Sequence, residues 1–176
     1  EENIKQTADI ISEKLKPYGL EYLQIDDGYQ QPGGQPEKWI VPNEKFPSGL
    51  EDLAAYIKSR GLKPGIWTNV AFHDSSFVDS HKQWFVTEDD GTAASGQWIG
   101  YLLDGSNPVT LDSLISPVYN YFRETGWEYY KLDALRHLLF EGYNSHSNFF
   151  EKKNTDREKA FRNVVERVRR DTGREH

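Results

Sequence analysis

The chain has 176 residues, a length that fits one domain, and 36% of them are hydrophobic and 28% charged, as in ordinary folded proteins. Its net charge of -7 and pI near 5.3 argue against a nucleic-acid partner and against an anionic membrane surface. Cysteine is absent, which excludes disulfides and thiolate chemistry but leaves the compartment unknown.

The amino-terminal part predicts a helix, a strand and a long loop. Apolar residues recur at helical spacing through residues 3–17, and Pro17 and Gly19 end that pattern. We expect a strand at 21–26, where an apolar and aromatic run follows the glycine. Residues 30–47 form a loop rich in glycine and proline, and its unusual length for a plain connection hints at a functional role.

A second unit of helix and strand follows, and then the pattern breaks. Ser48 opens a capping-box pattern, which predicts a helix that ends at Gly61. A strand is expected next, at 63–69. Residues 70–108 are interpreted as an excursion loop within the domain, with one short extra strand at 101–104.

The third unit and a final helix complete the chain. Residues 111–125 have helical spacing despite Pro117, and a strand is expected at 127–133. Residues 137–154 are interpreted as an aromatic, polar loop, and a capping box at 155–158 opens the last helix. Helix, glycine and strand thus recur three times, which is typical of parallel βα architecture.

Two of the expected strands end in the same phrase. Glu-Tyr-Leu-Gln-Ile-Asp ends at Asp26, and Glu-Tyr-Tyr-Lys-Leu-Asp ends at Asp133. Side chains alternate along a strand, so Lys131 shares a face with Asp133. Because Lys and Asp are rarely buried without a partner or a task, these strand ends predict a site. Asp27 directly follows Asp26, and the repulsion between them calls for a metal, a cation or hydroxyl donors.

Other candidate residues carry a weaker signal. Trp67, near the end of the second strand, fits a core position or a sugar platform equally well. His73, Asp74, Asp79 and His81 invite a metal interpretation, but they lack a tight ligand spacing. We interpret them as solvated loop residues, and we expect neither a metal site nor a cofactor.

Three strands with their helices amount to about half of an eight-fold (β/α)8 TIM-type barrel, which typically needs about 250 residues. We therefore predict an α/β fold in which residues 1–176 form a single partial barrel domain. In this prediction the domain lacks the first strand and the carboxyl-terminal strands, and the chain is a piece of a longer or processed one. The candidate residues follow strand ends, where such barrels place their active sites.

Five motifs, in order, resemble the catalytic barrel of retaining α-galactosidases of the melibiase and raffinose-synthase group. One such motif is weak, but five in the right order are specific, and the resemblance covers nearly the whole chain. The motifs are Tyr-Leu-Gln-Ile-Asp-Asp-Gly-Tyr-Gln (22–30), Phe-Pro-Ser-Gly-Leu (46–50), Gly-Leu-Lys-Pro-Gly-Ile-Trp (61–67), Leu-Asp-Gly-Ser-Asn-Pro (103–108) and Lys-Leu-Asp-Ala-Leu-Arg (131–136).

The resemblance implies a hydrolase that cleaves terminal α-galactosyl groups by a retaining double displacement. Asp133 would be the nucleophile that forms a covalent glycosyl-enzyme. Lys131 would bind a sugar hydroxyl and help to keep Asp133 ionised, because an opposite charge lowers a carboxyl pKa. Arg136 matches the family arginine three residues after the nucleophile, and we include it among the substrate-binding residues.

The resemblance also implies how the galactosyl group would be recognised. Asp26 and Asp27 would accept hydrogen bonds from the 4- and 6-hydroxyls, and Trp67 would form a wall beside the sugar. Charged hydrogen bonds of this kind are strong and geometrically strict, so they can discriminate axial from equatorial hydroxyls. The expected partners are an α-galactoside oligosaccharide or glycoconjugate and the rest of the barrel, with an oligomer possible.

The chain departs from the family pattern in ways that keep alternatives open. The family's general acid/base sits on a later strand, so we expect it beyond His176 and expect the fragment to be inactive alone. Leu135 stands where the family often has Asn, and residues 70–108 contain no Arg. These departures concern the sugar 2-position, so an α-N-acetylgalactosaminidase or a raffinose-synthase-type transglycosidase remains open. Outside that chemistry, a metal-dependent or Schiff-base barrel enzyme and a non-catalytic sugar-binding protein remain alternatives.

Overall fold

The computed structural model describes residues 1–33 and 35–173. In that part of the chain, β1 (Tyr22–Ile25), β2 (Lys63–Thr68) and β3 (Tyr129–Leu132) form one parallel sheet in the order β1-β2-β3. Ile25 lies opposite Ile66, and Thr68 lies opposite Leu132, so the three strands end at a common edge. The prediction of parallel strands is confirmed, and each strand is one to three residues shorter than expected.

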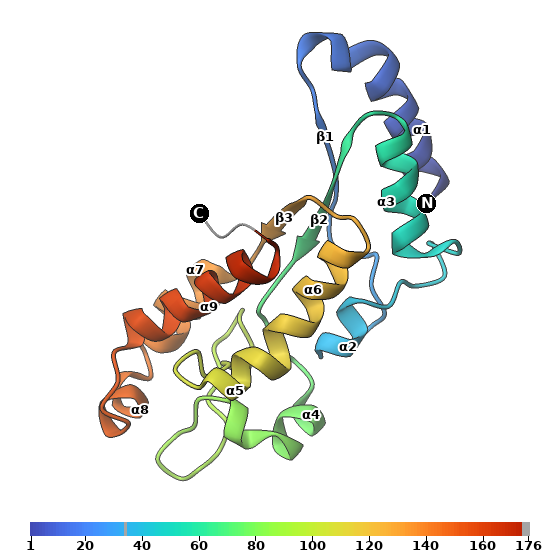
Figure 1. Cartoon of the computed structure of the whole chain (residues 1–176). Helices are drawn as coiled ribbons and strands as arrows, with labels where there is room; N and C mark the ends of the chain where they lie inside the picture. Colours follow the sequence, from blue (N-terminus) through green and yellow to red (C-terminus); the bar gives the residue numbers. More distant parts are fainter. Residues whose placement is uncertain (34, 174–176) are drawn as a thin grey trace.

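Among the described residues, the longer helices accompany the strands (Figure 1). They are α1 (Glu2–Ile10), α3 (Gly49–Ser59), α6 (Ser116–Glu124) and α9 (Arg157–Asp171). α1 continues through a π-helical turn (Ile11–Leu15) and a 3-10 turn (Lys16–Tyr18), as the predicted helix requires. α3 packs on α1 and β2, and α6 packs on α9. Among the described residues, none of the helices combines the length and the apolar character that crossing a membrane needs.

Short helices occupy segments that the sequence assigns to loops. The loop predicted at 30–47 contains α2 (Pro36–Trp39), and the excursion contains α4 (Ser75–Ser80) and a 3-10 turn (Lys82–Trp84). The loop predicted at 137–154 is wrong, since α7 (Leu135–His137), a π-helical segment (Leu138–Tyr143) and α8 (Ser147–Lys152) fill it. Buried Leu138, Tyr143 and Phe150 show the reason: tertiary packing stabilises these short helices.

The segment 108–115 also folds as helix, ahead of Pro117. α5 (Pro108–Thr110) and a π-helical segment (Leu111–Ile115) lead directly into α6. The predicted helix at 111–125 is therefore confirmed and starts earlier than expected. Proline lacks the N–H that an unbroken α-helix would use, which is consistent with the wider π-helical turn before it.

Three predicted details, two helix caps and one short strand, are wrong. Ser48 does not cap α3 with its side chain; its hydroxyl donates to the carboxylate of Glu1 instead. The side chain that caps α9 is Asp156. The strand expected at 101–104 consists only of isolated bridges, such as Phe85 to Leu103. The irregular pairing follows from the winding of the excursion, which brings several short segments together without a continuous ladder.

The two faces of the sheet have different roles. Ile25, Ile66 and Thr68 are buried on the face toward the helices, where the Thr68 hydroxyl lies 2.9 Å from the hydroxyl of Tyr119. The opposite face carries partly exposed side chains, and Tyr22 and Tyr129 contact each other there with ring centroids 5.8 Å apart. Because side chains alternate along a strand, this second face also presents the side chains that reach the strand ends.

Gly65 keeps the open face of the sheet closely packed, and we expect its substitution to be costly. A Cβ at position 65 would lie 2.8 Å from Cδ1 of Tyr129 and 3.2 Å from Cβ of Gln24. We predict that Gly65→Ala lowers the free energy of unfolding by about 1–3 kcal/mol through overpacking, measured by urea denaturation. Gly65→Ala/Tyr129→Ala is the matched control and should recover part of the loss. Full stability of the single variant would contradict this packing account.

Candidate active site

Most of the predicted site residues lie at the carboxyl ends of the three strands. Asp26 and Asp27 follow β1, and Asp133 follows β3. Trp67 and Lys131 are the penultimate residues of β2 and β3. The chain turns sharply after Asp133, where Ala134 has φ 65°, a left-handed conformation that is uncommon for a residue with a Cβ. Unusual backbone of this kind is often found at functional sites, and no local sequence pattern predicts it here.

Lys131 forms an ion pair with Asp26 across the sheet. Its Nζ lies 2.8 Å from Oδ2 of Asp26, which also accepts a hydrogen bond of 2.8 Å from Nε2 of Gln24. The hydrogen bond from Lys131, together with the backbone N–H of Asp27, holds the pKa of Asp26 below its usual value. The same pair, with Asp133 as a more distant negative charge, raises the pKa of Lys131. Lys131 is therefore a cation beside the two adjacent carboxylates, one of the three kinds of partner that the sequence left open.

Asp133 is held by two N–H donors. Nε1 of Trp67 donates to Oδ2 of Asp133 at 3.1 Å, and the backbone N–H of Ala134 donates to Oδ1 at 2.8 Å. Lys131 and Asp133 lie two residues apart, so they share a face of the sheet as predicted. The hydrogen bond of Lys131 goes across the sheet to Asp26, however, and Asp133 interacts with Lys131 only as a more distant charge.

Asp27 and Trp67 line one cleft of about 710 Å³. Oδ1 of Asp27 accepts a hydrogen bond of 2.7 Å from Nε2 of Gln30, so each of the adjacent aspartates has its own partner. Trp67 is buried, with 7% of its surface exposed, and still lines this cleft. It is therefore a core residue that also lines the cleft, and its role as a sugar platform stays a prediction.

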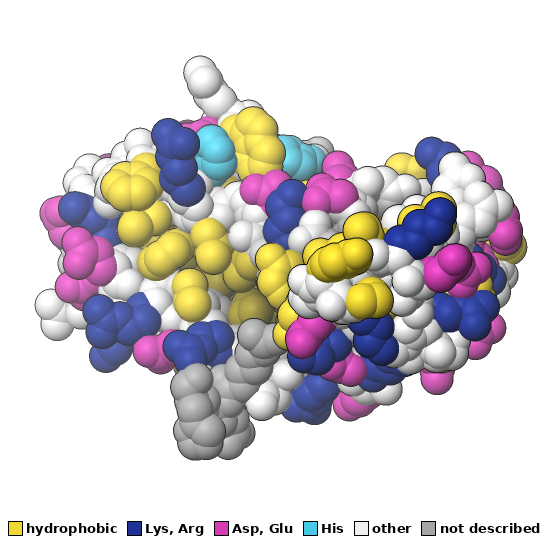
Figure 2. Space-filling view, turned by 90° about the horizontal axis from the view of Figure 1, so that it is seen from above, with side chains coloured by type: hydrophobic (Ala, Val, Ile, Leu, Met, Phe, Trp, Pro, Cys, Tyr) yellow, Lys and Arg dark blue, Asp and Glu magenta, His cyan; other side chains and the backbone are white. Residues whose placement is uncertain are grey.

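The ion pair from Lys131 to Asp26 and the hydrogen bond from Trp67 to Asp133 together tie β1, β2 and β3 at one edge. Figure 2 shows acidic, basic, histidine and hydrophobic side chains next to one another along the upper edge of the face that it presents. An exposed Arg136 lies on α7 and makes no hydrogen bond or ion pair with another described residue. Five of the six predicted site residues thus meet in one region.

The remaining carboxylates of interest have structural partners. Asp104 is 1% exposed, and its Oδ2 lies 2.5 Å from Nζ of Lys153. Glu141 accepts a hydrogen bond from the backbone N–H of Trp98 at 2.7 Å and lies 3.0 Å from Nδ1 of His137. Asp74 caps α4. Residues 1–33 and 35–173 contain no group of three or more His, Cys, Asp or Glu side chains arranged to hold a metal ion.

The sequence did not single out Trp98, which lines the same cleft with Trp67. Nearly half of this side chain, 48%, is exposed. Its ring stacks on His137 with centroids 4.6 Å apart. A tryptophan between Gly96 and Gly100 in the excursion was the available signal, because glycines flanking a large aromatic residue suggest a tight turn that displays it.

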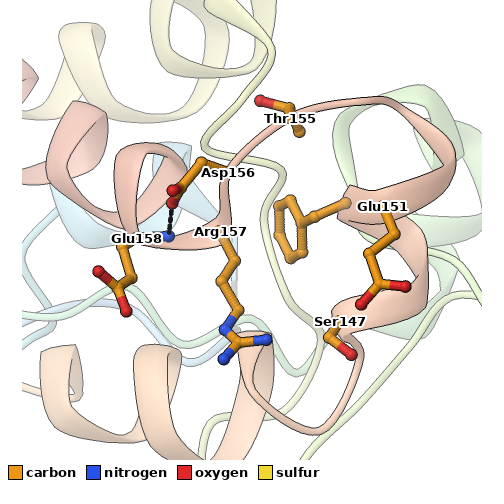
Figure 3. A pocket seen from close by; sticks show the side chains of 7 residues that line it. Ser147, Glu151, Thr155, Asp156, Arg157 and Glu158 are labelled. Carbon is orange, nitrogen blue, oxygen red and sulfur yellow. Dashed lines mark hydrogen bonds between the residues drawn. The ribbon is translucent and has the colours of Figure 1, made fainter.

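A second hollow, of about 250 Å³, lies between α8 and the start of α9 (Figure 3). Asp156 caps the helix there: its Oδ1 accepts hydrogen bonds from the backbone N–H groups of Glu158 at 2.7 Å and Lys159 at 2.9 Å. The hollow contains none of the predicted site residues, and its aspartate is engaged in the fold.

Loss of the Asp156 cap should lower stability in a pH-dependent way. The N–H groups of Lys159 and Glu158 hold the pKa of Asp156 below its usual 3.8. A lowered pKa contributes stability above the pKa of the unfolded chain, and this contribution is lost as the pH falls through the folded value. We predict that Asp156→Ala lowers Tm by about 2–4 °C at pH 7 and by less below about pH 4. Asp156→Asn, which keeps a capping oxygen, is the control; a constant difference across this pH range would contradict the prediction.

Taken together, the fold and the site define an α/β protein whose carboxylate-bearing site lies at the common end of parallel strands. The melibiase family model matches residues 2–170, and the chain belongs to this family. A curated relative, alpha-galactosidase 2 of Pediococcus pentosaceus, is 30% identical over 130 residues, which are 70% of this chain and 18% of that protein. The chain spans about a fifth of the length of the curated relatives it matches.

Solved structures share the fold. The alpha-galactosidase TtGalA of Thermus thermophilus, in complex with p-nitrophenyl α-D-galactopyranoside, has a TM-score of 0.68 and 24% identity, with 98% of this chain and 34% of that chain covered. A putative alpha-N-acetylgalactosaminidase from Bacillus halodurans has a TM-score of 0.66 and 16% identity, with 99% of this chain and 42% of that chain covered.

Proposed function

We propose that this chain forms the nucleophile-bearing half of a retaining α-galactosidase. In this proposal, residues 1–176 are a single partial domain of an eight-stranded (β/α)8 barrel, interrupted by the excursion at 70–108. The remaining strands cover the open face of the sheet and supply the general acid/base from beyond His176. The proposal is supported by membership of the melibiase family and by the convergence of Asp26, Lys131, Trp67 and Asp133 at one edge of the sheet.

The observation that carries the proposal is the setting of Asp133. Each carboxylate oxygen accepts a hydrogen bond from an N–H group, so the carboxylate has a fixed orientation next to Trp67, which lines the cleft. A fixed nucleophile can attack the anomeric carbon without the entropy cost of finding its position. In a retaining mechanism, the second carboxyl group stands about 5–5.5 Å away on the other side of the glycosidic bond and protonates the leaving oxygen.

Asp26, Asp27 and Lys131 would bind the galactosyl group. Asp26 keeps one edge of its carboxylate on Lys131 and is exposed, and Asp27 lines the cleft, so both can accept hydroxyl hydrogen bonds. Arg136 is exposed on α7 and has room to reach a substrate from outside the strand ends. An α-galactoside oligosaccharide or glycoconjugate is the proposed substrate.

The direct test is hydrolysis by the full-length protein that carries this chain. We expect turnover of p-nitrophenyl α-galactoside, little turnover of the α-glucoside, and α-galactose as the first anomer seen by NMR. A first product with the β configuration would reject the retaining mechanism. Loss of activity on chelation, or reduction of a substrate adduct onto Lys131 by borohydride, would favour the metal-dependent or Schiff-base alternative.

A 2-acetamido sugar is the second candidate substrate, and a specific observation favours keeping it. The excursion at 70–108 contains no arginine, and Leu135 follows the nucleophile at the position where the family often has Asn. Comparison of kcat/KM for p-nitrophenyl α-galactoside and the matching α-N-acetylgalactosaminide decides between the two. We expect the galactoside to be preferred, and the reverse preference would reassign the substrate.

A further inference from the structure

Trp98 is displayed at the cleft by a turn that is built to hold it. The backbone N–H of Gly96 donates to the carbonyl oxygen of Gly100 at 2.9 Å, which closes the turn between them. Gly100 has φ +68°, and a Cβ there would meet Nδ1 of His73 at 2.7 Å, so glycine is required. Ile99 is fully buried and anchors the turn, while its neighbour Trp98 points outward.

The outward ring is also supported from behind. One face of Trp98 stacks on His137, with ring centroids 4.6 Å apart and an interplanar angle of 25°. Glu141 uses both oxygens for this arrangement: Oε1 accepts the backbone N–H of Trp98, and Oε2 lies 3.0 Å from Nδ1 of His137. A Cβ at Gly96 would lie 2.5 Å from Oε1 of Glu141, so the carboxylate approaches the turn closely only because residue 96 is glycine.

A large aromatic residue with this much support is expected to be buried, yet 48% of Trp98 is exposed. It lines the cleft of about 710 Å³ together with Trp67 and Asp27. His73 and Gln97 also line this cleft, and their polar side chains make no hydrogen bond with another described residue. An aromatic face beside polar groups without partners fits the apolar face and hydroxyl edge of a sugar ring.

From this geometry, and resting on the proposed function above, we propose that Trp98 is the platform of a subsite for the sugar ring bonded to the galactosyl group. The galactosyl ring itself is assigned to the strand ends, where Asp26, Lys131 and Asp133 converge. Trp98 comes from the excursion instead of a strand end, and it leans on His137 of α7, so we assign it to the neighbouring ring. Glu141 acts as a positioning residue that holds the platform.

The test compares two substrates of the full-length protein. α-Galactosyl fluoride has no sugar in the leaving group, whereas melibiose carries glucose there. For Trp98→Ala we expect the ratio of kcat/KM for melibiose to kcat/KM for the fluoride to fall by about three- to tenfold, mostly through KM. Trp98→Phe should retain most of the ratio. Tyr18→Ala removes an aromatic side chain that is 88% exposed and far along the chain from the cleft, and it should keep the wild-type ratio.

Glu141→Ala tests the positioning role. We expect the ratio to fall in the same direction as in Trp98→Ala but less, because the ring remains and only its support is lost. An unchanged ratio in Trp98→Ala overturns the subsite. If kcat/KM falls equally for both substrates, which also leaves the ratio unchanged, Trp98 contacts the galactosyl ring or only supports the fold.

A binding measurement separates failure of the subsite from failure of the proposed function. In an Asp133→Ala background, calorimetry gives Kd for galactose and for melibiose without turnover. We expect the added Trp98→Ala substitution to raise Kd for melibiose relative to galactose by about the same three- to tenfold. If the wild-type protein does not turn over α-galactosyl fluoride, the proposed function fails and this Kd ratio alone decides the subsite. A ratio unaffected by Trp98→Ala rejects it.

Discussion

Asp133→Ala is expected to lower kcat for α-galactoside hydrolysis by about 10⁴-fold or more in the full-length protein, because loss of a nucleophile removes the covalent route. The N–H groups of Trp67 and Ala134 lie 3.1 and 2.8 Å from the two carboxylate oxygens, and they would lose their acceptor. The measurement is the initial rate with p-nitrophenyl α-galactoside, whose good leaving group keeps the reaction measurable in a crippled variant.

Rescue of activity by azide distinguishes a missing nucleophile from a missing binding residue. A small anion can enter the space left by the missing carboxylate and attack the anomeric carbon directly. We expect azide to restore turnover of Asp133→Ala and to yield β-galactosyl azide, since one displacement inverts the configuration. The matched control is Asp79→Ala, an exposed aspartate that pairs with Lys82 outside the cleft, which should retain wild-type rates. A variant that keeps most of its activity would show that Asp133 is not the nucleophile and would favour a sugar-binding role.

Lys131→Met is expected to produce the second-largest loss, about 10²–10³-fold in kcat/KM, the range for removal of one preorganised charged donor. The substitution keeps the length of the side chain but removes the ion pair of 2.8 Å to Asp26. It also removes the positive charge nearest to the pair of adjacent aspartates, so their mutual repulsion is no longer offset. Both effects disturb the surface on which the proposed galactosyl hydroxyls bind.

The pH dependence of kcat/KM tests the Lys131→Met variant independently. Lys131 is the main cause of the lowered pKa of Asp26, so its removal should return that pKa toward the usual 3.8. Asp26 then takes up a proton at a higher pH, and the acidic limb of kcat/KM should move upward. Lys63→Met is a close control, because Lys63 forms an equally short ion pair of 2.8 Å with Glu21 at the opposite end of the strands. Equal losses in both lysine variants would contradict a specific role for Lys131.

Double substitution of Asp26 and Lys131 checks that the two act together. Residues within one ion pair couple, so Asp26→Asn/Lys131→Met should lose much less than the sum of the two single losses expressed as free energies. Additive losses would mean that the pair in the structure contributes little to the proposed reaction.

The sequence was sufficient for the parts of the fold that follow from periodicity. Glycine-terminated helices and apolar runs predicted β1, β2 and β3 and the longer helices, because spacing of 3.6 and 2 residues reflects which face is buried. It was insufficient for the segment 137–154. Phe150 and Tyr143 gain their burial from distant partners such as Leu103, whose carbonyl oxygen accepts the Tyr143 hydroxyl at 2.7 Å. Contacts of that range leave no local pattern.

The sequence predicted which residues lie near the strand ends but only part of how they contact one another. The repeated strand phrase identified Asp26 and Asp133, and the alternation of side chains placed Lys131 on their face of the sheet. The choice of partner for Lys131 depended on the register of β1 against β2 and of β2 against β3, which no single strand reveals. The cap at Ser48 failed for a similar reason, since Glu1 competes for the hydroxyl from a distant part of the chain. Trp98 was missed because an exposed aromatic residue in a long loop has no periodic signature.

The most direct measurement is to trap the glycosyl-enzyme on the full-length protein with 5-fluoro-α-galactosyl fluoride and to locate the label by peptide mass spectrometry. Fluorine at C5 destabilises the oxocarbenium-like transition states, and the fluoride leaving group still permits the first displacement. We expect the label on the peptide that contains Asp133, and on Asp133 itself after fragmentation. A label on any other carboxylate, or steady turnover with no trapped adduct, would contradict the assignment of Asp133 as the nucleophile.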